Sequence, residues 1–422
     1  MHYFRYKNNE LYCENVKVTD IVRRYGSPCY VYSYRTLLEH FKKLQDAFRE
    51  IDPLICYSVK ANSNLAILKA LVNEGAGLDV VSAGELYRAL KVKVDPKKIV
   101  FAGVGKTSSE IEYAIRAGIL FFNVESEQEL ELIHEIAIRL RKTVEVCLRI
   151  NPEVDPHTHH YIKTAKKESK FGLSFAAARH ILLNRNRFFN INIKGLHIHI
   201  GSQITEARPY IQAIKKVREF IKEMSKIDVN FGYFNIGGGL GIIYNKETTQ
   251  TAKIFAKAII PLLKNTKLRI ILEPGRFIAG SAGILATKVT YIKNTENKNF
   301  IIVDAGMSDL IRPALYEAYH DIVPIRKKSK VRHLEYDIVG PICESGDFFA
   351  KDRIMAQVEP GDLLAIMCAG AYGFSMSSNY NSRLRIGEVL VKDNRFLLIR
   401  KRETRLDLVK KEKIPMFLRK YV

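Results

Sequence analysis

The chain has 422 residues, 47% of them hydrophobic and 27% charged, so it has room for two or three folded domains and is neither mainly disordered nor fibrous. Its 67 Lys and Arg residues against 45 Asp and Glu residues give a net charge of +22, which raises the hypothesis of an anionic partner such as nucleic acid. The sequence contains no run of about 18–20 apolar residues and begins without the apolar segment of a secretory signal, so we expect no membrane span.

Two short segments rich in β-branched and aromatic residues, 11–18 and 28–33, lie near the N-terminus and predict strands. They precede the regular pattern of the next 250 or so residues. We therefore expect residues 1–32 to form strands that pack with the β domain predicted at the C-terminal end of the chain.

Residues 33–279 alternate short apolar segments with amphipathic segments of helical period. Eight strands are expected, at 53–60, 77–82, 97–103, 118–124, 143–150, 193–200, 232–238 and 267–274. Strands that alternate with helices predict parallel β/α units, and eight such units in about 250 residues predict an α/β fold of the (β/α)8 TIM-barrel type. A doubly wound open sheet is the alternative, but such sheets usually have fewer strands.

From residue 280 onward, segments of helical period become rare. Apolar segments joined by short polar turns occur at 284–294, 299–306, 335–345, 362–370 and 388–402. This pattern predicts a second domain, residues 280–422, built mainly from antiparallel strands.

Polar residues stand where the barrel strands are expected to end. Lys60 closes the first strand, Asp79 lies on the second, and His199 closes the sixth; three glycines, 237–239, follow the seventh strand and Glu273 ends the eighth. TIM-barrel enzymes carry their chemistry at the carboxyl ends of the strands. We therefore expect an active site at this rim of the barrel.

The lysine and the histidines of this rim also have ordinary structural explanations. The Lys60 amine could simply extend into solvent, but a desolvated lysine amine can instead form a Schiff base with an aldehyde. His197 and His199 lie on one face of a strand and could bind a metal. Because no carboxylate or cysteine neighbours them at ligand spacing, we expect no metal site.

The glycines and the glutamate complete a recognisable set. Gly237, Gly238 and Gly239 could form only a tight turn, but exposed glycine amides also bind phosphate, and the loops after strands seven and eight are the usual phosphate site of this fold. Glu273 could form a rim ion pair, or hold a proton on a heteroaromatic nitrogen. A Schiff-base lysine, a phosphate site and such a carboxylate together predict the cofactor pyridoxal 5′-phosphate.

Over nearly its whole length the sequence resembles the fold-type III pyridoxal-phosphate-dependent decarboxylases, most closely the diaminopimelate decarboxylase family. The resemblance is carried by YSVKAN, DVVSAGEL, HIHIGSQI, NIGGGLG and EPGRFI, and most specifically by RPALYEAYH and CESGD. It implies a pyridoxal-phosphate-binding barrel, a C-terminal β domain, and a homodimer with shared active sites. The implied activity converts meso-2,6-diaminopimelate into L-lysine and CO2, the last step of lysine biosynthesis.

The resemblance also implies a role for each motif residue. Lys60 is expected to carry the cofactor, His199 to stack on its pyridine ring, and Glu273 to bind the pyridine nitrogen. The other expected cofactor-binding residues are Asp79, Ser202, Gly237, Gly238, Gly239, Pro274, Gly275, Arg276 and Tyr372. The expected substrate-binding residues are Arg276, Arg312, Tyr316, Glu344 and Tyr372, and Cys343 is the expected proton donor, contributed by the partner subunit.

The residue types suit this chemistry. A carboxylate at the pyridine nitrogen, Glu273, favours decarboxylation, whereas the similar alanine racemases use an arginine there. Arg312 and Tyr316 are four residues apart, so one helical turn would place both on one face. An arginine and a glutamate suit the distal carboxylate and ammonium of diaminopimelate. A related decarboxylase of ornithine, arginine or carboxynorspermidine remains the alternative. A decarboxylase of ornithine or lysine would need only an acidic partner.

Three further expectations concern the rest of the chain. The six cysteines are far apart and form no C-x-x-C pair, which favours reduced thiols in a cytoplasmic protein. The basic segments near the C-terminus alternate with acidic and apolar residues and lack any nucleic-acid-binding signature, so we expect a solvated surface and no nucleic acid partner. The segment 155–170, rich in His and Lys, is a candidate mobile lid.

Overall fold

The computed structural model describes residues 2–155, 170–245, 247–329 and 331–418 of the chain. The chain divides into two compact units, one formed by Tyr34–Ala282 and the other by His2–Ser33 together with Gly283–Val422. Among the described residues, no helix combines the length and the apolar character that crossing a membrane requires. Each unit is considered by itself below.

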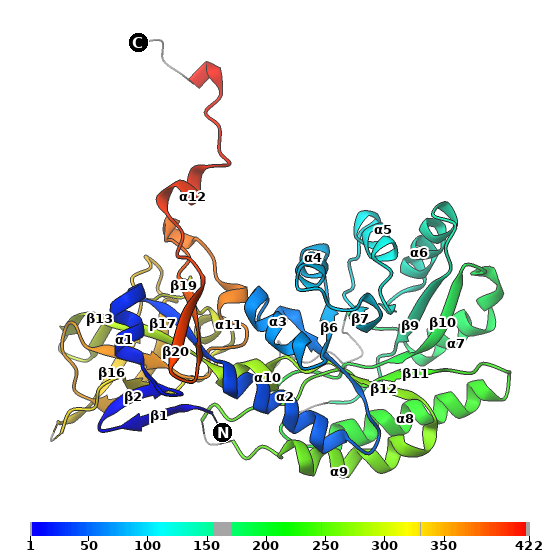
Figure 1. Cartoon of the computed structure of the whole chain (residues 1–422), viewed down its shortest axis with the longest axis horizontal. Helices are drawn as coiled ribbons and strands as arrows, with labels where there is room; N and C mark the ends of the chain where they lie inside the picture. Colours follow the sequence, from blue (N-terminus) through cyan, green and yellow to red (C-terminus); the bar gives the residue numbers. More distant parts are fainter. Residues whose placement is uncertain (1, 156–169, 246, 330, 419–422) are drawn as a thin grey trace. The chain divides into compact units, whose positions relative to one another are not determined.

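The first unit is a closed barrel of eight parallel strands (Figure 1). The strands are β5 (Leu54–Ser58), β6 (Gly77–Val80), β7 (Ile99–Phe101), β8 (Phe121–Val124), β9 (Val144–Arg149), β10 (Ile191–His197), β11 (Tyr233–Asn235) and β12 (Arg269–Leu272). They follow one another around the barrel in chain order, and β12 pairs with β5 to close it. The predicted (β/α)8 barrel is therefore confirmed.

A helix follows every barrel strand, and one more precedes the first strand. The helices are α2 (Tyr34–Phe48), α3 (Leu65–Asn73), α4 (Ala83–Lys91), α5 (Ser108–Ala117), α6 (Glu127–Arg139), α7 (Phe175–Leu183), α8 (Arg208–Ser225), α9 (Ala252–Leu263) and α10 (Arg276–Ala279). Short polar residues fix their starts: the Thr107 and Ser126 side chains, for example, accept hydrogen bonds from backbone amides of α5 and α6. These caps fix where the helices begin, and thereby the length of the loops that follow the strand ends.

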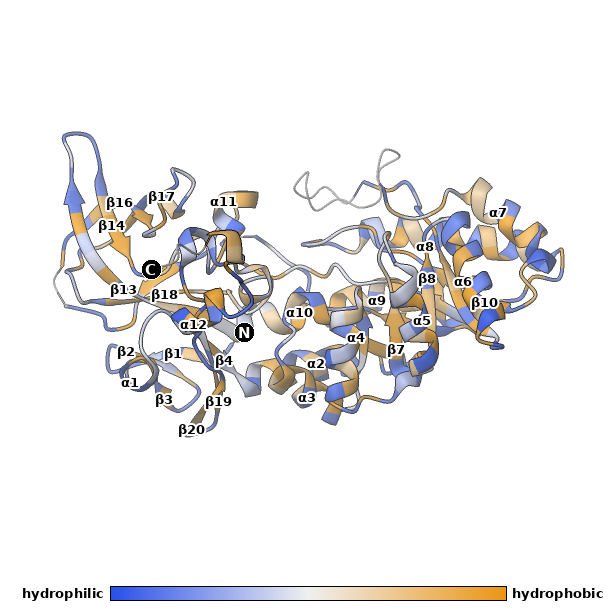
Figure 2. Cartoon of the chain, turned by 90° about the horizontal axis from the view of Figure 1, so that it is seen from above, coloured by the Kyte–Doolittle hydropathy of each residue, from blue (hydrophilic) through white to orange (hydrophobic). Residues whose placement is uncertain are grey.

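Burial on both faces explains why the barrel strands lack a clean alternation of polar and apolar residues. Every residue of β5, β6, β7 and β8 is buried. The strands are drawn mainly in apolar colours and the surrounding helices in mixed colours (Figure 2). This is the pattern of parallel strands covered by helices, and it leaves the strand ends as the place for polar chemistry.

The second unit contains a three-stranded sheet and a nine-stranded sheet. Its elements are β1 (Phe4–Lys7), β2 (Glu10–Cys13), β3 (Val16–Lys17), α1 (Val18–Tyr25), β4 (Cys29–Ser33), β13 (Gly283–Asn294), β14 (Asn299–Val303), α11 (Arg312–Tyr316), β15 (Ile322–Pro324), β16 (His333–Val339), β17 (Phe348–Ala356), β18 (Leu363–Ile366), β19 (Gly387–Lys392), β20 (Arg395–Arg400) and α12 (Arg405–Val409). Most neighbouring strands run antiparallel, as predicted; β14–β16 and β4–β19 are parallel.

The N-terminal strand β4 joins the large sheet of this second unit. It pairs with β13 on one side and with β19 on the other, so all five of its residues are buried. Three strands, β1, β15 and β17, were not predicted. In β17 the sequence FFAKDRIMA places charged residues among apolar ones, and the strand is recognisable only from its pairing with β16.

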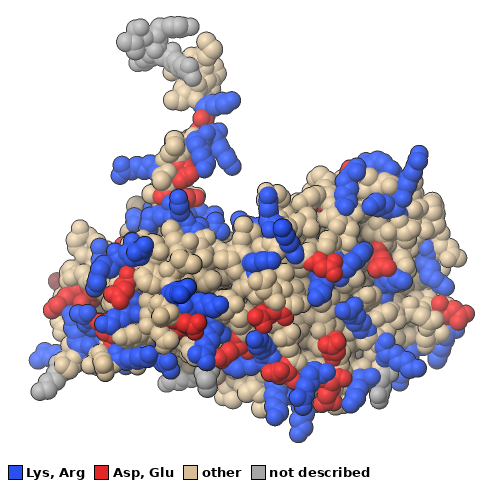
Figure 3. Space-filling view, viewed as in Figure 1, with Lys and Arg blue, Asp and Glu red and all other residues tan. Residues whose placement is uncertain are grey.

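The excess positive charge is dispersed on the face of the chain shown in Figure 3. Lys and Arg side chains are interspersed there with Asp and Glu side chains and with uncharged surface. A surface that tracks a phosphate backbone needs basic side chains gathered in a stripe or patch. The face in Figure 3 carries no such stripe.

One buried ion pair is part of the barrel wall. The Lys106 Nζ lies 2.6 Å from Glu129 Oε1, and both side chains are almost fully buried. The same amine donates to the carbonyl oxygens of Gly103 and Asn123, at 2.8 and 2.9 Å. Burial raises the pKa of Glu129, and Lys106 counteracts that rise. The amine therefore both neutralises a buried carboxylate and ties the loop after β7 to β8.

We expect the substitution Lys106→Met to destabilise the barrel by about 3–5 kcal/mol near neutral pH, because it leaves the Glu129 carboxylate buried without its cation. Without Lys106 the folded-state pKa of Glu129 rises further above its unfolded value. The free energy of unfolding of the variant is then highest at low pH, where Glu129 is protonated, and falls as pH rises. The loss of stability relative to wild type should therefore be smaller at about pH 5 than at pH 8.

Thermal unfolding followed by circular dichroism measures this effect, with the exposed Lys142→Met as the matched control. Equal melting temperatures for the two variants at pH 8 would contradict the assigned role of the buried pair.

Candidate active site

The first group of rim residues centres on Lys60, which follows β5 in a short 3-10 turn (Val59–Ala61). Its Nζ lies 2.6 Å from Asp79 Oδ2, and the Ser58 hydroxyl donates to the same oxygen at 2.7 Å. Asp79 is fully buried, so burial raises its pKa, while Lys60 and Ser58 oppose the rise. The Lys60 side chain keeps about a third of its surface exposed, so its amine is held in place yet open to a ligand.

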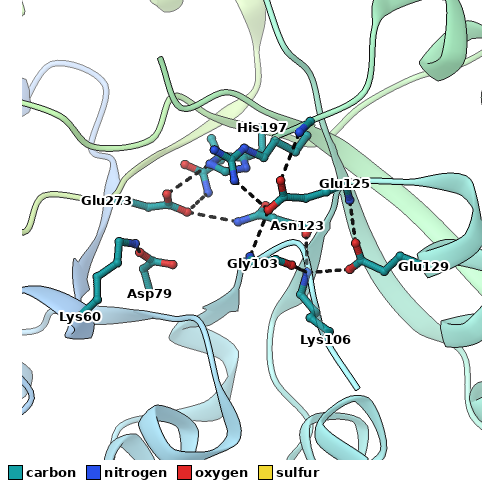
Figure 4. Close-up of polar contacts among 12 residues, drawn as sticks. Lys60, Asp79, Gly103, Lys106, Asn123, Glu125, Glu129, His197 and Glu273 are labelled. Atoms are coloured by element: carbon teal, nitrogen blue, oxygen red, sulfur yellow. Dashed lines mark hydrogen bonds and ion pairs between the residues drawn. The ribbon is translucent and has the colours of Figure 1, made fainter. Parts of the chain in front are cut away.

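The second group surrounds the buried carboxylate of Glu273, just after β12 (Figure 4). Its Oε1 accepts from Asn235 Nδ2 at 2.6 Å and from Asn123 Nδ2 at 3.2 Å. Its Oε2 contacts His197 Nε2 at 3.2 Å. These three side chains come from the ends of β11, β8 and β10, so three different strands supply hydrogen-bond donors to one anion.

Two opposite pKa shifts follow from this arrangement. Burial by itself would raise the pKa of Glu273, but His197 and Lys60 lower it well below its usual range, so the group stays ionised. Burial lowers the pKa of His199 well below its usual range, and the positive charges of Arg149 and Lys60 add to this. His199 is therefore neutral, and its Nδ1 accepts from the Gly238 amide at 3.2 Å, which leaves the proton on Nε2.

The glycine turn, Gly237–Gly239, follows β11 and is packed too tightly for side chains. A Cβ atom on Gly238 would lie 1.9 Å from the Glu273 carbonyl oxygen. Gly237 has φ +72°, and its amide donates to Asn235 Oδ1 at 2.9 Å. Among the described residues, the amides of Gly239 and Gly275 have no acceptor. These two amides are thus available to an anionic ligand.

Arg276 stands beside these amides. Its guanidinium donates to the Ser202 hydroxyl, from Nη2 at 3.0 Å, and to the Tyr244 hydroxyl, from Nη1 at 2.7 Å. The side chain is buried, so its orientation is fixed by its partners. Gly201, which precedes Ser202, is also in close contact with Gly239. A cation, a hydroxyl and two glycine amides thus gather at one place after β10, β11 and β12.

Behind the carboxylate lies a second buried polar layer (Figure 4). Arg149 Nη1 lies 2.7 Å from Glu125 Oε1, and both side chains are almost fully buried. Glu125 also accepts from the amides of Gly103 and Gly172, at 3.1 and 3.2 Å. This layer ties together the loops that follow β7, β8 and β9.

In the second unit, the helix α11 carries Arg312 and Tyr316 at its two ends, so the expected helical turn is observed. Arg312 is buried, and its Nη1 lies 2.8 Å from His320 Nε2. The His320 Nδ1 lies 2.8 Å from the Met367 carbonyl oxygen and must donate to it. Nε2 is therefore the acceptor of a neutral imidazole, which orients Arg312 without neutralising its charge.

Cys343 and Glu344 lie in a loop that the buried Asp347 holds together. The Asp347 carboxylate accepts from the amides of Met307 and Ile342, at 2.6 and 2.7 Å. Cys343 is exposed. Glu344 accepts from the Tyr380 hydroxyl at 3.3 Å and lines a pocket of about 350 Å³. The other residues that line this pocket are Met307, Ile311, Ala314, Leu315, Gly346 and Tyr380.

The structure therefore brings most of the predicted rim residues together. The residues that gather in the barrel unit are Lys60, Asp79, His199, Ser202, Gly237, Gly238, Gly239, Glu273, Pro274, Gly275 and Arg276. Arg312, Tyr316, Cys343, Glu344 and Tyr372 belong to the second unit. The candidate lid, 155–170, lies outside the described residues except at its two ends.

Some residues of the site were not predicted from the sequence. Asn123 and Asn235 are single amides inside apolar strands, and only the closed barrel shows that both bind Glu273. His197 was considered as a metal ligand, whereas it contacts this carboxylate. Within the described residues, no three His, Cys, Asp or Glu side chains gather as they would around a metal ion. Glu85 is a further omission, since burial raises its pKa to about 7 beside Lys60.

The barrel residues fit pyridoxal 5′-phosphate, the cofactor that the rim predicted. The glycine turn, which has no room for side chains, leaves two amides for the phosphate, next to Arg276 and Ser202. A partly exposed amine, Lys60, can bind an aldehyde, and an ionised carboxylate, Glu273, can accept a proton-bearing pyridine nitrogen. The site thus has a complementary group for each functional part of the cofactor.

Comparison with known families agrees with this chemistry. The family described as "Pyridoxal-dependent decarboxylase, pyridoxal binding domain" matches residues 34–280, which is more than half of the chain. These limits follow the barrel unit closely. The fold and the site thus define a pyridoxal-dependent decarboxylase.

Individual relatives show which family of pyridoxal-dependent decarboxylases the chain is similar to. The diaminopimelate decarboxylase of Aquifex aeolicus (strain VF5) is 48% identical over 402 residues, which cover 95% of each chain. The structure of the Helicobacter pylori diaminopimelate decarboxylase complexed with L-lysine is 42% identical, with a TM-score of 0.90 over 94% of this chain and 99% of that one. The M. jannaschii enzyme in co-complex with L-lysine is 40% identical, with a TM-score of 0.93 over 98% of both chains. This chain belongs to the diaminopimelate decarboxylase family.

We expect the substitution Gly238→Ala to weaken the binding of pyridoxal 5′-phosphate by roughly tenfold or more, because the new methyl group must displace the Glu273 backbone or the glycine turn. Titration of the purified protein with the cofactor, followed by absorbance, measures the affinity. Gly105→Ala is the matched control, since a Cβ at Gly105 meets no atom within 4 Å. Equal affinities in the two variants would show that the turn does not constrain the cofactor site.

Proposed function

We propose that this chain is a carboxy-lyase that converts meso-2,6-diaminopimelate into L-lysine and CO2, the last step of lysine biosynthesis. The observation that carries the decarboxylase chemistry is the buried, ionised Glu273 with its three hydrogen-bonding neighbours. The substrate follows from the relatives, which are diaminopimelate decarboxylases, two of them in structures with L-lysine. A decarboxylase of ornithine, arginine or carboxynorspermidine, the alternative, is not favoured by these relatives.

Each barrel residue has a task in holding pyridoxal 5′-phosphate. Lys60 supplies the amine that anchors the cofactor, and Glu273 binds its pyridine nitrogen. The phosphate-binding residues are Ser202, Gly237, Gly238, Gly239, Pro274, Gly275 and Arg276, with Tyr372 from the second unit. When bound, the cofactor accepts the electron pair that the substrate carbon keeps when CO2 leaves.

The remaining chemistry is done by side chains that keep their protonation state. Glu273 stays anionic and therefore stabilises a proton on the pyridine nitrogen. The neutral His199 lies against the ring without adding a positive charge beside it. Asp79 orients the Lys60 amine through its 2.6 Å contact and compensates its charge. Together these residues keep the cofactor in its electron-accepting form.

Substrate recognition requires groups for both ends of the substrate. Diaminopimelate has an amino acid group at each end, so one end must be held while the other reacts. Arg276, Arg312, Tyr316 and Tyr372 bind its carboxylates, and Glu344 binds its distal ammonium. Arg312 suits a carboxylate because its neighbour His320 is neutral, so that the charge of the guanidinium is not cancelled by this contact.

The protein acts as a homodimer with shared active sites. Cys343 is exposed in its own subunit, as a group that serves a partner must be. From the partner subunit, its thiol donates the proton that takes the place of the lost carboxylate on the substrate's α-carbon. The enzyme works in the cytoplasm, where its six cysteines remain thiols.

The purified protein should show a visible absorbance band after incubation with pyridoxal 5′-phosphate, and should release CO2 from meso-diaminopimelate but not from ornithine. Lys60→Ala should lose the band and nearly all turnover, because no other amine takes its place. Glu273→Gln should keep the band and lower kcat by about a hundredfold or more, because it removes the anion at the pyridine nitrogen. Turnover of ornithine without turnover of diaminopimelate would overturn the proposed substrate.

The shared active site is tested by mixing two inactive variants. Lys60→Ala lacks the cofactor anchor and Cys343→Ala lacks the proton donor, so each alone should be nearly inactive. After the subunits exchange, mixed dimers contain one site with both groups intact, and activity should rise to about a quarter of wild type at equal concentrations, if the subunits pair at random. Mixtures that stay inactive although mass spectrometry shows mixed dimers would contradict a shared site.

A further inference from the structure

Asn235, the last residue of β11, makes two different hydrogen bonds with one side chain. Its Nδ2 donates to Glu273 Oε1 at 2.6 Å, and its Oδ1 accepts from the Gly237 amide at 2.9 Å. A carboxylate accepts hydrogen bonds and a backbone amide donates them, so the two partners fix the orientation of the amide group. The side chain is fully buried, and no solvent competes for either bond.

Asparagine is required by this pair of partners. An aspartate of the same shape could still accept from Gly237, but it would place a second anion against Glu273. A leucine of similar volume could do neither. The neighbouring Asn123 offers a comparison, because its Nδ2 also donates to Glu273 Oε1, at 3.2 Å, whereas among the described residues its Oδ1 accepts no hydrogen bond from the glycine turn.

The donors around Glu273 also decide where a ligand can bind. Each carboxylate oxygen has two acceptor positions, and Oε1 uses both of them for Asn123 and Asn235. Oε2 uses one for His197, so among the described residues one position is left, on Oε2. The two amides therefore direct a further proton donor to a single oxygen of the carboxylate.

We infer that Asn235 is a positioning residue that couples the two ends of the cofactor site: its nitrogen orients the carboxylate for the pyridine ring, and its oxygen holds the glycine turn for the phosphate. The inference rests on the proposed function, since it takes pyridoxal 5′-phosphate as the ligand. A single side chain, which itself need not touch the cofactor, thus fixes the position of the Glu273 carboxylate relative to the glycine turn, and these two groups bind the cofactor.

The test compares three variants, N235D, N235L and N123D, with the wild-type chain and with N186D, a control that makes the same chemical change at an exposed asparagine. Two ligands are titrated into each, pyridoxal 5′-phosphate and pyridoxal, which lacks the phosphate. The dissociation constant of pyridoxal divided by that of pyridoxal 5′-phosphate reports the phosphate end. The pH dependence of the visible band of the bound cofactor reports the carboxylate end.

N235D and N123D should each bind both ligands about tenfold or more weakly than wild type, because a donor to a charged group is lost. Both should also gain a transition in the band between about pH 5 and 9, because two carboxylates in contact share a proton. Their ratio of dissociation constants should match that of wild type. In N235L the ratio should fall roughly threefold to tenfold, because the glycine turn is no longer held.

Two results would overturn the inference: neither aspartate variant gains the pH transition, or N235L keeps the wild-type ratio. Circular dichroism checks that each variant is folded, and N235A replaces N235L if the leucine variant is not. A wild-type chain that binds neither ligand would overturn the proposed function itself, which is a different outcome from variants that bind like wild type.

Discussion

The buried carboxylate of Glu273 is the constraint on which the barrel site depends. An ion in a protein interior costs several kcal/mol unless neighbouring dipoles and charges replace the water it has lost. Here the replacements come from Asn123, His197 and Asn235, which lie at or next to the ends of three different strands. These residues are far apart in the sequence, and only a sheet that closes on itself brings the more distant strand β8 to the same carboxylate as β10 and β11. The closed barrel is therefore required to keep the buried Glu273 carboxylate ionised, and the decarboxylase chemistry requires that ionised carboxylate.

The same constraint recurs in the layer behind the site. Lys106 with Glu129, and Arg149 with Glu125, are ion pairs almost without solvent, and each also binds backbone groups of the loops after β7 or β8. Replacing such pairs with apolar residues often leaves stability unchanged or improves it, so stability alone does not explain them. Their effect here is electrostatic and local: the positive charge of Arg149 helps to keep His199 neutral, and Lys106 fixes the backbone of Asn123, whose amide contacts Glu273.

Sequence patterns predicted those parts of the molecule whose structure follows from the local spacing of apolar and charged residues. Eight apolar segments separated by amphipathic ones were sufficient for the barrel, and charged residues at strand ends marked Lys60 and Glu273. Asn123 and Asn235 were not found, because a single amide in an apolar strand looks the same whether it faces a helix or a carboxylate across the barrel. The strand β17 was missed for a related reason. Lys351, Asp352 and Arg353 obscure its alternation of polar and apolar residues, and its pairing with β16 is seen only in the tertiary structure. Resemblance supplied the roles in the second unit, where no periodic pattern distinguishes Cys343 from an ordinary thiol.

The choice of substrate makes demands that the barrel alone does not meet. The barrel residues can hold a cofactor and one carboxylate, which any amino acid decarboxylase requires. A substrate with an amino acid group at each end needs, in addition, a cation and an anion for its far end. In the second unit, the buried Arg312 contacts the neutral imidazole of His320, and Glu344 lines a pocket of about 350 Å³. On the proposed assignment, ornithine has no distal carboxylate for Arg312 to bind, so it would lose a contact that diaminopimelate makes. Specificity on this assignment comes from the contacts at the far end of the substrate, which a substrate with a single carboxylate cannot make in full.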